Sequence, residues 1–282
     1  MALNRACLGK AYPSVTSEVS GAAIEQYARA CNDDNPRYFN ETDGIVAPPM
    51  FAVTATWIAL ISALTDPALR ADLLRLLHRA QDMAFFRPIR PGDVINSTAR
   101  IVAIETIAGG ETIALELDAR DDRDKAVSKA VFTAFIRGRR DSAQAMESKS
   151  EPIDERGEPC LAVTQTIDRD QTFRYAEASG DRNPIHVDDN VAKMAGLPGI
   201  IVHGLCTMAL TAKVIVDGLC EHDPLRLRRL AVRFSRPVFP GDQITTSVWP
   251  SAGNGRRVFT YETRNPAGFA VLRDGIAEIS PP

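Results

Sequence analysis

Apolar positions along the chain form two long stretches that predict buried helices, each followed by a run of predicted strands. Residues 50–64 and 205–219 are apolar on nearly all sides, which is typical of a helix enclosed by protein. In the first half, Gly109-Gly110 and the charged run 118–125 mark hairpin turns. In the second half, turn formers separate four strand-like segments: 227–236, 243–249, 257–265 and 269–279. We therefore expect three or four strands per half and an α+β fold, in which a sheet wraps a helix.

The two halves of the chain repeat each other at three places, in the same order. The similar segments are YARACNDDNPRY at Tyr27 and YAEASGDRNPIH at Tyr175, GIVAPPM at Gly44 and GIIVHGL at Gly199, and FFRPIRPGD at Phe85 and FSRPVFPGD at Phe234. Their separations, about 150 residues each, indicate one unit used twice.

A change of composition marks the boundary between these units. The stretch 141–160 is polar and charged, contains prolines and shows no apolar periodicity, as an exposed linker would. We expect a first domain at residues 1–140 and a second at 161–282.

Composition excludes several classes of protein. With 33 Lys and Arg against 36 Asp and Glu, the net charge is −3, and no basic surface for nucleic acid is indicated. Five scattered cysteines without a C-x-x-C pair argue against disulfides and zinc. The start of the chain has no apolar stretch typical of a secretory signal, so we expect a cytoplasmic protein. Pro48 and Pro49 break the uncharged stretch 44–64, so no membrane span is predicted either.

Candidate chemistry gathers in the second half. Asp181 and His186 lie five residues apart across a proline-containing loop, so both can point into one cleft and hold a water molecule between them. Asn183 can fix this loop. Gly204 lies where the second buried helix should begin, and its backbone N–H could stabilise a negatively charged thioester oxygen. Taken singly, each feature has an ordinary explanation: a turn, a structural histidine or a helix cap.

Taken together, these residues resemble the hydratase motif of the MaoC-like family, the (R)-specific or type 2 enoyl-CoA hydratases and dehydratases. The matching residues are Tyr175, the run 179–186 (SGDRNPIH), Ala192, Gly196, the run 201–204 (IVHG) and the later FSRPVFPGD segment. The resemblance covers nearly all of the second half, and the first half in degenerate form. It implies a double hot-dog fold, with two antiparallel sheets that each wrap a long central helix and join side by side.

The resemblance also implies roles. Asp181 and His186 match the catalytic acid–base pair, Asn183 its supporting residue and Gly204 the oxyanion-hole amide. The implied reaction is reversible syn hydration of trans-2-enoyl-CoA to (R)-3-hydroxyacyl-CoA, without metal or other cofactor, because coenzyme A belongs to the substrate. The sequence leaves open which group activates water; we favour His186 for water and Asp181 for C2.

The first half departs from this motif. Tyr38 stands where His186 stands, and Pro48-Pro49 replaces the His-Gly pair, so that no N–H is offered at the oxyanion position. We expect this half to be catalytically inactive and to accommodate the acyl chain instead. The candidate lining residues, which could equally be plain core, are Met50, Phe51 and Trp57.

Further substrate contacts and several alternatives remain open at this level. We assign Ser179 and Arg236 to substrate binding, since a cation near the cleft would help to hold coenzyme A phosphates. The alternatives are a thioesterase, a Cys206 nucleophile beside His203, and a non-catalytic acyl-thioester-binding module. We expect the chain to form a homodimer.

Overall fold

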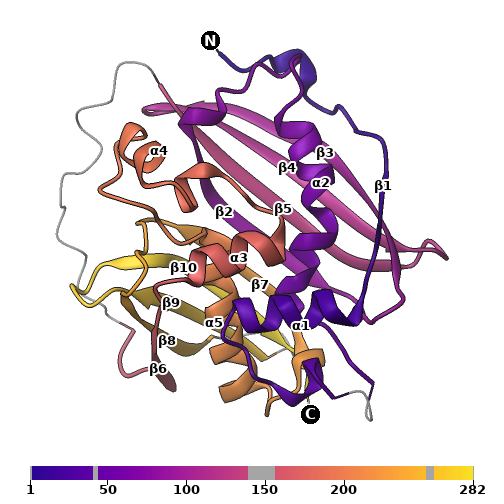
Figure 1. Ribbon diagram of the computed structural model, residues 1–282, viewed down its shortest axis with the longest axis vertical. Helices are drawn as coiled ribbons and strands as arrows, with labels where there is room; N and C mark the ends of the chain where they lie inside the picture. The colour runs from indigo at the N-terminus through magenta and orange to yellow at the C-terminus, as the bar shows by residue number, and fades with distance from the viewer. Residues whose placement is uncertain (1, 41–43, 139–155, 252–256, 282) are drawn as a thin grey trace.

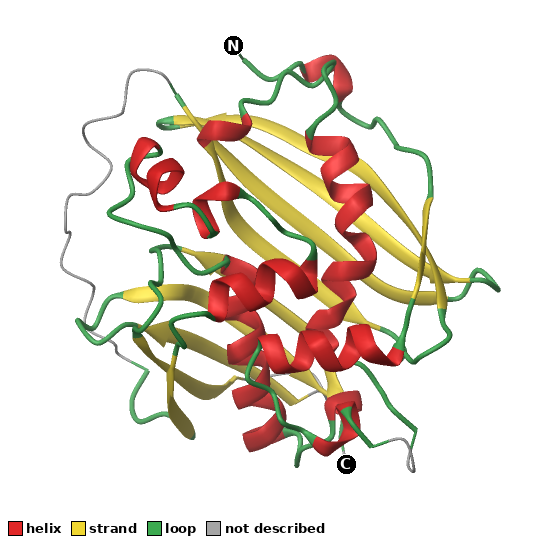
Figure 2. Ribbon diagram, in the orientation of Figure 1, coloured by secondary structure: helices red, strands yellow, loops and turns green. Residues whose placement is uncertain are grey.

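A computed structural model describes residues 2–40, 44–138, 156–251 and 257–281 of the 282-residue chain. Ten strands pair antiparallel into one continuous sheet, and a long helix lies against each half of this sheet (Figure 1). The sheet curves around the two long helices (Figure 2). The predicted α+β architecture, with a sheet wrapped on a helix in each half, is therefore confirmed.

Both halves contribute the same order of elements. The first half contains β1 (Val15–Glu18), α1 (Gly21–Ala30), α2 (Ala52–Leu64), β2 (Leu76–Phe85), β3 (Val94–Ile107), β4 (Gly110–Asp121) and β5 (Ala126–Arg137). The second half contains β6 (Leu161–Thr166), α3 (Gln171–Ser179), α4 (Asp189–Met194), α5 (Gly204–Leu219), β7 (Leu227–Phe234), β8 (Gln243–Ser251), β9 (Arg257–Arg264) and β10 (Ala270–Ile279). The short helix α4 has no counterpart among the described residues of the first half.

The strand order β1-β3-β4-β5-β2-β7-β10-β9-β8-β6 places β2 and β7 at the centre of the sheet, where the two halves meet. In this central pair Asp82 lies opposite Ala231, which stands 149 positions later in the chain. The hydroxyl groups of Tyr27 and Tyr175, which are 148 positions apart, also approach each other to 3.4 Å. Equivalent residues that face each other mark a pseudo-twofold axis, so the two halves pack as the subunits of a symmetric dimer would.

The central helices bury their apolar residues against the concave side of the sheet. Helix α2 packs mainly on β3 and β4, and the hydroxyl of Ser97 donates to the carbonyl of Ala55 in its second turn. In the second half the buried hydroxyls of Thr211, Thr246 and Thr263 bond to one another, which satisfies polar groups beneath α5. No helix of the described segments combines the length and hydropathy needed to cross a membrane.

The predicted elements differ from the structure in a few places. Within the described residues each half contributes five strands instead of three or four, and the short edge strands β1 and β6 are the ones that the sequence does not predict. Residues 118–121 lie on β4, so that only the end of the run 118–125 forms the turn. Helix α2 begins at Ala52 because the prolines before it support a 3-10 turn at Pro49–Phe51. Of the predicted linker at 141–160, residues 141–155 lie outside the described residues.

Candidate active site

The turn at residues 181–186, called here the second-half turn, is built from successive side-chain bonds to backbone N–H groups. Helix α3 ends at Gly180, whose φ of +82° is a left-handed conformation that glycine adopts at little cost. The carboxylate of Asp181 accepts from the N–H of Asn183 (3.2 Å), and the Asn183 side chain accepts from Ile185 (3.3 Å). The motif is thus a true turn, and its hydrogen bonds also fix the direction of Asp181.

His186 is held in one orientation by a backbone carbonyl and a second histidine. Its Nδ1 lies 2.8 Å from the carbonyl oxygen of Ile201, which can only accept, so Nδ1 carries the proton. The ring stacks on that of His203, with centroids 3.8 Å apart and planes inclined by 26°. A neutral His186 therefore keeps its lone pair on Nε2, where it can accept a proton from water.

Asp181, His186 and His203 each offer a ligand-type atom, and these atoms lie within 4.8 Å of one another. Such a group could in principle hold a metal ion. The Nε2 of His203, however, donates to the backbone carbonyl of Asp181 (2.9 Å), and its Nδ1 lies 3.3 Å from the hydroxyl of Thr172. One ring nitrogen of His203 thus bonds to the second-half turn and the other contacts α3, which favours acid–base chemistry over metal binding. The expected absence of a metal stays a prediction.

The surroundings shift the two titratable groups in opposite directions. Burial raises the pKa of Asp181 above its ordinary value, although His186 and the N–H of Asn183 act against this. Burial lowers the pKa of His186, although Asp181 and the Ile201 carbonyl act against this. Both shifts favour the uncharged form of the group over its ordinary balance, and the uncharged carboxyl and imidazole are the forms of a general acid and a general base.

Gly204 is the first residue of α5 and directly follows His203. The first N–H groups of a helix have no partner within it and carry a partial positive charge. A side chain would fit tightly at this position, because a Cβ atom would lie 3.0 Å from the ring of Phe234. Gly204 thus directly follows His203, whose ring stacks on that of His186, and its role as an oxyanion donor stays a prediction.

The corresponding turn of the first half, residues 33–38, has the same backbone path without the same groups. Asn35 accepts from the N–H of Arg37 (3.0 Å), as Asn183 does from Ile185. Tyr38 is fully buried, and among the described residues its hydroxyl has no hydrogen-bond partner. This turn therefore lacks an acid–base pair, in line with the expectation for this half.

The predicted substrate-binding residues lie in different surroundings. Met50 and Phe51 are buried near the pseudo-twofold axis, where Tyr27 donates to the Met50 carbonyl (3.0 Å) and packs edge-on against Phe51. Trp57 is half-buried and covers Gly180: a Cβ atom there would meet its ring at 3.2 Å. A residue of the first half thus touches the second-half turn.

The hydroxyl of Ser179 is occupied within the chain, since it donates to the Tyr175 carbonyl (2.7 Å) and accepts from the N–H of Asp181 (3.2 Å). The guanidinium of Arg236 stacks on the ring of Phe269 at 4.2 Å. A binding role for either residue stays a prediction. Cys206 is fully buried, which argues against the alternative of a cysteine nucleophile.

Sequence reasoning missed two supports of the site. Thr172 donates to the carbonyl of His186 (2.7 Å) from the first turn of α3, and His203 stacks on His186 and holds Asp181. The nearness of His203 to a conspicuous Gly204 was a signal for the second residue. A threonine nine positions before Asp181 carries no comparable signal.

The chain is similar to known hydratases and dehydratases. Residues 153–267 match the MaoC like domain family, and residues 6–129 match the FAS1-like, dehydratase domain region. Enoyl-CoA hydratase 2, peroxisomal, of Arabidopsis thaliana is 30% identical over 242 residues, which span 80% of this chain and 75% of that protein. Probable enoyl-CoA hydratase 2 of Dictyostelium discoideum is 26% identical over 265 residues, which span 92% of this chain and 90% of that protein.

Solved structures show the same fold. A MaoC-like dehydratase superposes with a TM-score of 0.83 at 20% identity and covers 98% of both chains. A Mycobacterium tuberculosis protein described as having a double hotdog fold superposes with a TM-score of 0.66 at 12% identity, over 96% of this chain and 95% of that one. The double hot-dog expectation is confirmed, and the chain belongs to the MaoC-like family of hydratases and dehydratases.

Proposed function

We propose that this protein catalyses the reversible addition of water to trans-2-enoyl-CoA to form (R)-3-hydroxyacyl-CoA. The observation that carries this proposal is the second-half turn, which brings Asp181 and a neutral His186 within 4.8 Å of each other beside the start of α5. Two relatives are named enoyl-CoA hydratase 2, and a third, 29% identical over 72% of this chain, is named 3-hydroxyacyl-thioester dehydratase Y.

His186 is the proposed base. Its Nδ1–H is bound to the Ile201 carbonyl, so Nε2 is the nitrogen that takes a proton from water while the water oxygen bonds to C3. The protonated carboxyl of Asp181 gives its proton to C2, and the electrons of the C2=C3 bond pass through the thioester oxygen. Transfer of the proton from His186 back to Asp181 restores both groups, and the sum of the steps is the addition of one water molecule.

The N–H of Gly204 is the proposed partner of the thioester oxygen as negative charge develops on it. A donor already fixed at the start of a buried helix needs no rearrangement during the reaction, which is why such donors contribute strongly to rate. Asp181 and His186 lie on one turn and therefore act on the same face of the double bond. This arrangement supports syn addition. The (R) configuration at C3 rests on the family resemblance, because it depends on which face of the double bond meets this pair.

The first half is proposed to accommodate the acyl chain. Trp57 reaches from α2 to Gly180, next to Asp181, and is the lining residue that the contacts support best. Met50 and Phe51 have almost no exposed surface and would have to move to contact an acyl chain. Replacing Trp57 by alanine should change kcat/KM for long enoyl-CoAs more than for crotonyl-CoA; equal changes would contradict this assignment.

Assembly and location stay proposals. Within one chain the two halves already pack together as a pair of hot-dog units. A homodimer would therefore contain two such pairs. One relative is named as peroxisomal, and we keep the cytoplasm as the proposed compartment.

The test is to follow the enoyl-thioester absorbance of crotonyl-CoA and longer enoyl-CoAs while free thiol is measured in parallel. Loss of absorbance without thiol release is the expected result. Release of thiol would instead identify a thioesterase, and binding without either change would identify a non-catalytic module.

Two single substitutions test the proposed acid and base roles. Asp181→Asn and His186→Ala should each lower kcat by a factor on the order of 10² to 10⁴, the usual contribution of a positioned acid or base. Both variants should keep the circular dichroism spectrum of the parent. Full activity in either one would remove the proposed mechanism.

A further inference from the structure

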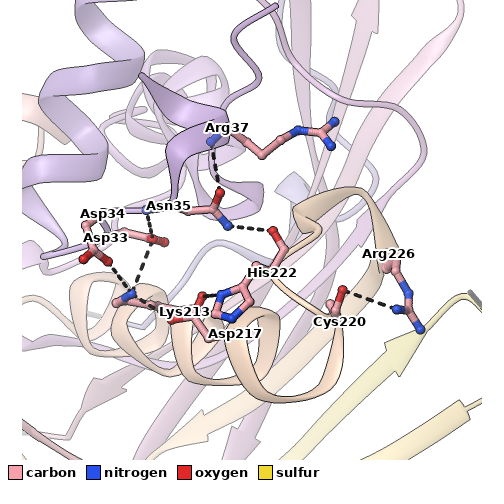
Figure 3. A network of polar contacts seen from close by, with 9 residues as sticks. All are labelled: Asp33, Asp34, Asn35, Arg37, Lys213, Asp217, Cys220, His222 and Arg226. Atoms are coloured by element: carbon pink, nitrogen blue, oxygen red, sulfur yellow. Dashed lines mark hydrogen bonds and ion pairs between the residues drawn. The ribbon is translucent and has the colours of Figure 1, made fainter. Parts of the chain in front are cut away.

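The first-half turn (residues 33–38) lies against the central helix of the second half. Lys213, in the middle of α5, places its ammonium 2.8 Å from Asp34 and 3.9 Å from Asp33 of this turn, and 2.7 Å from Asp217 on its own helix (Figure 3). Its side chain is only 19% exposed, so these ion pairs are partly shielded from water. We call these four residues the Lys213 cluster.

A second set of contacts extends the attachment beyond the end of α5. The side chain of Asn35 donates to the carbonyl of His222 (2.8 Å), and Arg37 lies 3.8 Å from Asp223. His222 in turn contacts Asp217 (3.1 Å), as Figure 3 shows. The first-half turn therefore contacts α5 at the middle of the helix, and it contacts the chain again just after the last residue of the helix.

The Lys213 cluster includes the buried carboxyl group of Asp33, which has no histidine partner in its turn because Tyr38 stands where His186 stands in the second half. Burial raises the pKa of Asp33 to about 7, while Lys213 acts in the opposite direction. Burial lowers the pKa of Lys213, but Asp217 and Asp34 more than offset this, so its net pKa lies above the ordinary value and the ammonium stays charged. Lys213 is thus a permanent cation beside Asp33, whereas the partner of Asp181 in the second-half turn is the titratable ring of His186.

The two turns differ in what the opposite central helix presents to them. Trp57 of α2 covers the second-half turn at Gly180 with an aromatic ring, whereas α5 presents a charged Lys213 to the first-half turn. The first contact leaves the neighbouring Asp181 free to react. The second engages both Asp33 and Asp34, so the first-half turn serves attachment.

Helix α5 connects this attachment to the active site. Gly204 and Lys213 are nine residues apart on one helix, roughly 14 Å at about 1.5 Å per residue. A hydrogen-bonded helix does not shorten or bend readily, so a sideways or axial shift at Lys213 reaches the N–H at Gly204. We propose that Lys213 is a positioning residue for hydration, which fixes α5 against the first-half turn so that Gly204 meets the thioester oxygen. This inference rests on the proposed function.

The experiment compares the kinetics of enoyl-CoA hydration in Lys213→Met and Lys213→Arg. The methionine variant keeps the length of the chain but removes the charge, and its kcat should fall about tenfold, since misplacement by about 1 Å can cost up to about a hundredfold. Its KM should stay within about twofold, because the substrate does not contact Lys213. The arginine variant keeps the cation and should recover most of kcat.

A matched control separates positioning from stability alone. Lys10 forms an ion pair with Asp66 (2.6 Å) away from α5 and is more exposed than Lys213 (42% against 19%), so Lys10→Met should lower the melting temperature only slightly and leave kcat unchanged. All rates are compared per folded protein, measured by circular dichroism well below each melting temperature. A Lys213→Met variant with the parent kcat, or an arginine variant no better than methionine, would overturn the inference.

A second variant covers the case in which Lys213→Met does not fold. Asp34→Asn/Asp217→Asn removes the two closest carboxylates while Lys213 can still be solvated, and it should show the same fall in kcat with unchanged KM. A parent-like kcat there would also overturn the inference. If the unmodified chain hydrates no enoyl-CoA, the proposed function fails instead, so the two failures are distinguishable.

Discussion

Replacing Gly204 by alanine tests whether the start of α5 is a catalytic position as well as a packing position. The added Cβ would lie 3.0 Å from Cδ1 and Cε1 of Phe234, closer than ordinary contact, so the ring or the helix must move by a few tenths of an ångström. Overpacking of this kind lowers the free energy of unfolding by about 1–3 kcal/mol, and the higher helix propensity of alanine offsets up to about 1 kcal/mol of this loss. We therefore expect a net loss of about 1 kcal/mol of unfolding free energy.

The loss of catalysis should be larger than this loss of stability. Alanine keeps its N–H, so the upper limit is the factor of about 10²–10³ that follows complete removal of an oxyanion donor. A displaced donor beside Phe234 should lower kcat at least about tenfold, or roughly 1.4 kcal/mol of barrier, with little change in KM.

Urea unfolding and steady-state hydration of crotonyl-CoA measure the two quantities on the same preparation. The matched control is Gly21→Ala, since Gly21 also begins a helix, and its added Cβ would meet Pro91 and Ile45 only at ordinary distances of 3.7 and 3.9 Å. Gly21→Ala should leave both stability and kcat near those of the parent. If Gly204→Ala keeps the parent kcat while it loses stability, the ring of Phe234 has moved instead of the helix, and the expected displacement of the N–H is refuted.

Two further predictions follow from the titratable groups. Because the pKa of His186 is lowered, the neutral base persists to a lower pH than for a free imidazole; because the pKa of Asp181 is raised, the protonated acid persists to a higher pH. A profile of kcat against pH should thus fall on the acid side as His186 gains a proton and on the alkaline side as Asp181 loses one, and a flat profile would contradict both assignments. Tyr38→Phe removes a buried hydroxyl without a partner among the described residues, and should stabilise the chain by about 1 kcal/mol in urea unfolding without changing kcat. A large loss of kcat in that variant would show that the first half takes part in the chemistry.

Most of the fold could be predicted from local sequence because its signals are local. The long helices were placed within two residues, since uninterrupted apolar stretches of that length are distinctive, and the strands of the second half end near turn formers. Strands β1 and β6 have four and six residues with much of their surface exposed, so they carry no apolar pattern. These two strands are defined by their pairing with β3 and β8 at the edges of the sheet. Their own residues do not indicate which strands they pair with.

The candidate site divides in the same way. Asp181, His186 and Gly204 belong to a compact motif, so their neighbourhood follows from one turn and one helix start. The stacking of His203 on His186 and the bond from Thr172 depend on how α3 packs against α5, which a linear pattern does not encode. The Lys213 cluster joins residues 179 positions apart, across the two halves, and only the packing of the halves reveals it.

The pseudo-twofold arrangement gives both halves an aspartate in the same turn, buried at Asp33 and half-buried at Asp181, yet only one of these carboxyl groups is suited to move protons. Asp181 faces His186, and burial shifts the pKa of the carboxyl upward and that of the ring downward, so the two values move toward each other and suit proton transfer between water, ring and carboxyl. Asp33 faces Lys213, whose raised pKa prevents it from releasing a proton near neutrality. A partner that can take up and release a proton therefore makes Asp181 an acid catalyst. A partner that stays charged makes Asp33 an attachment point. On this reasoning a histidine at position 38 would not restore activity to the first half, because Pro48 and Pro49 offer no N–H there and Lys213 would still hold Asp33 in its ion pair.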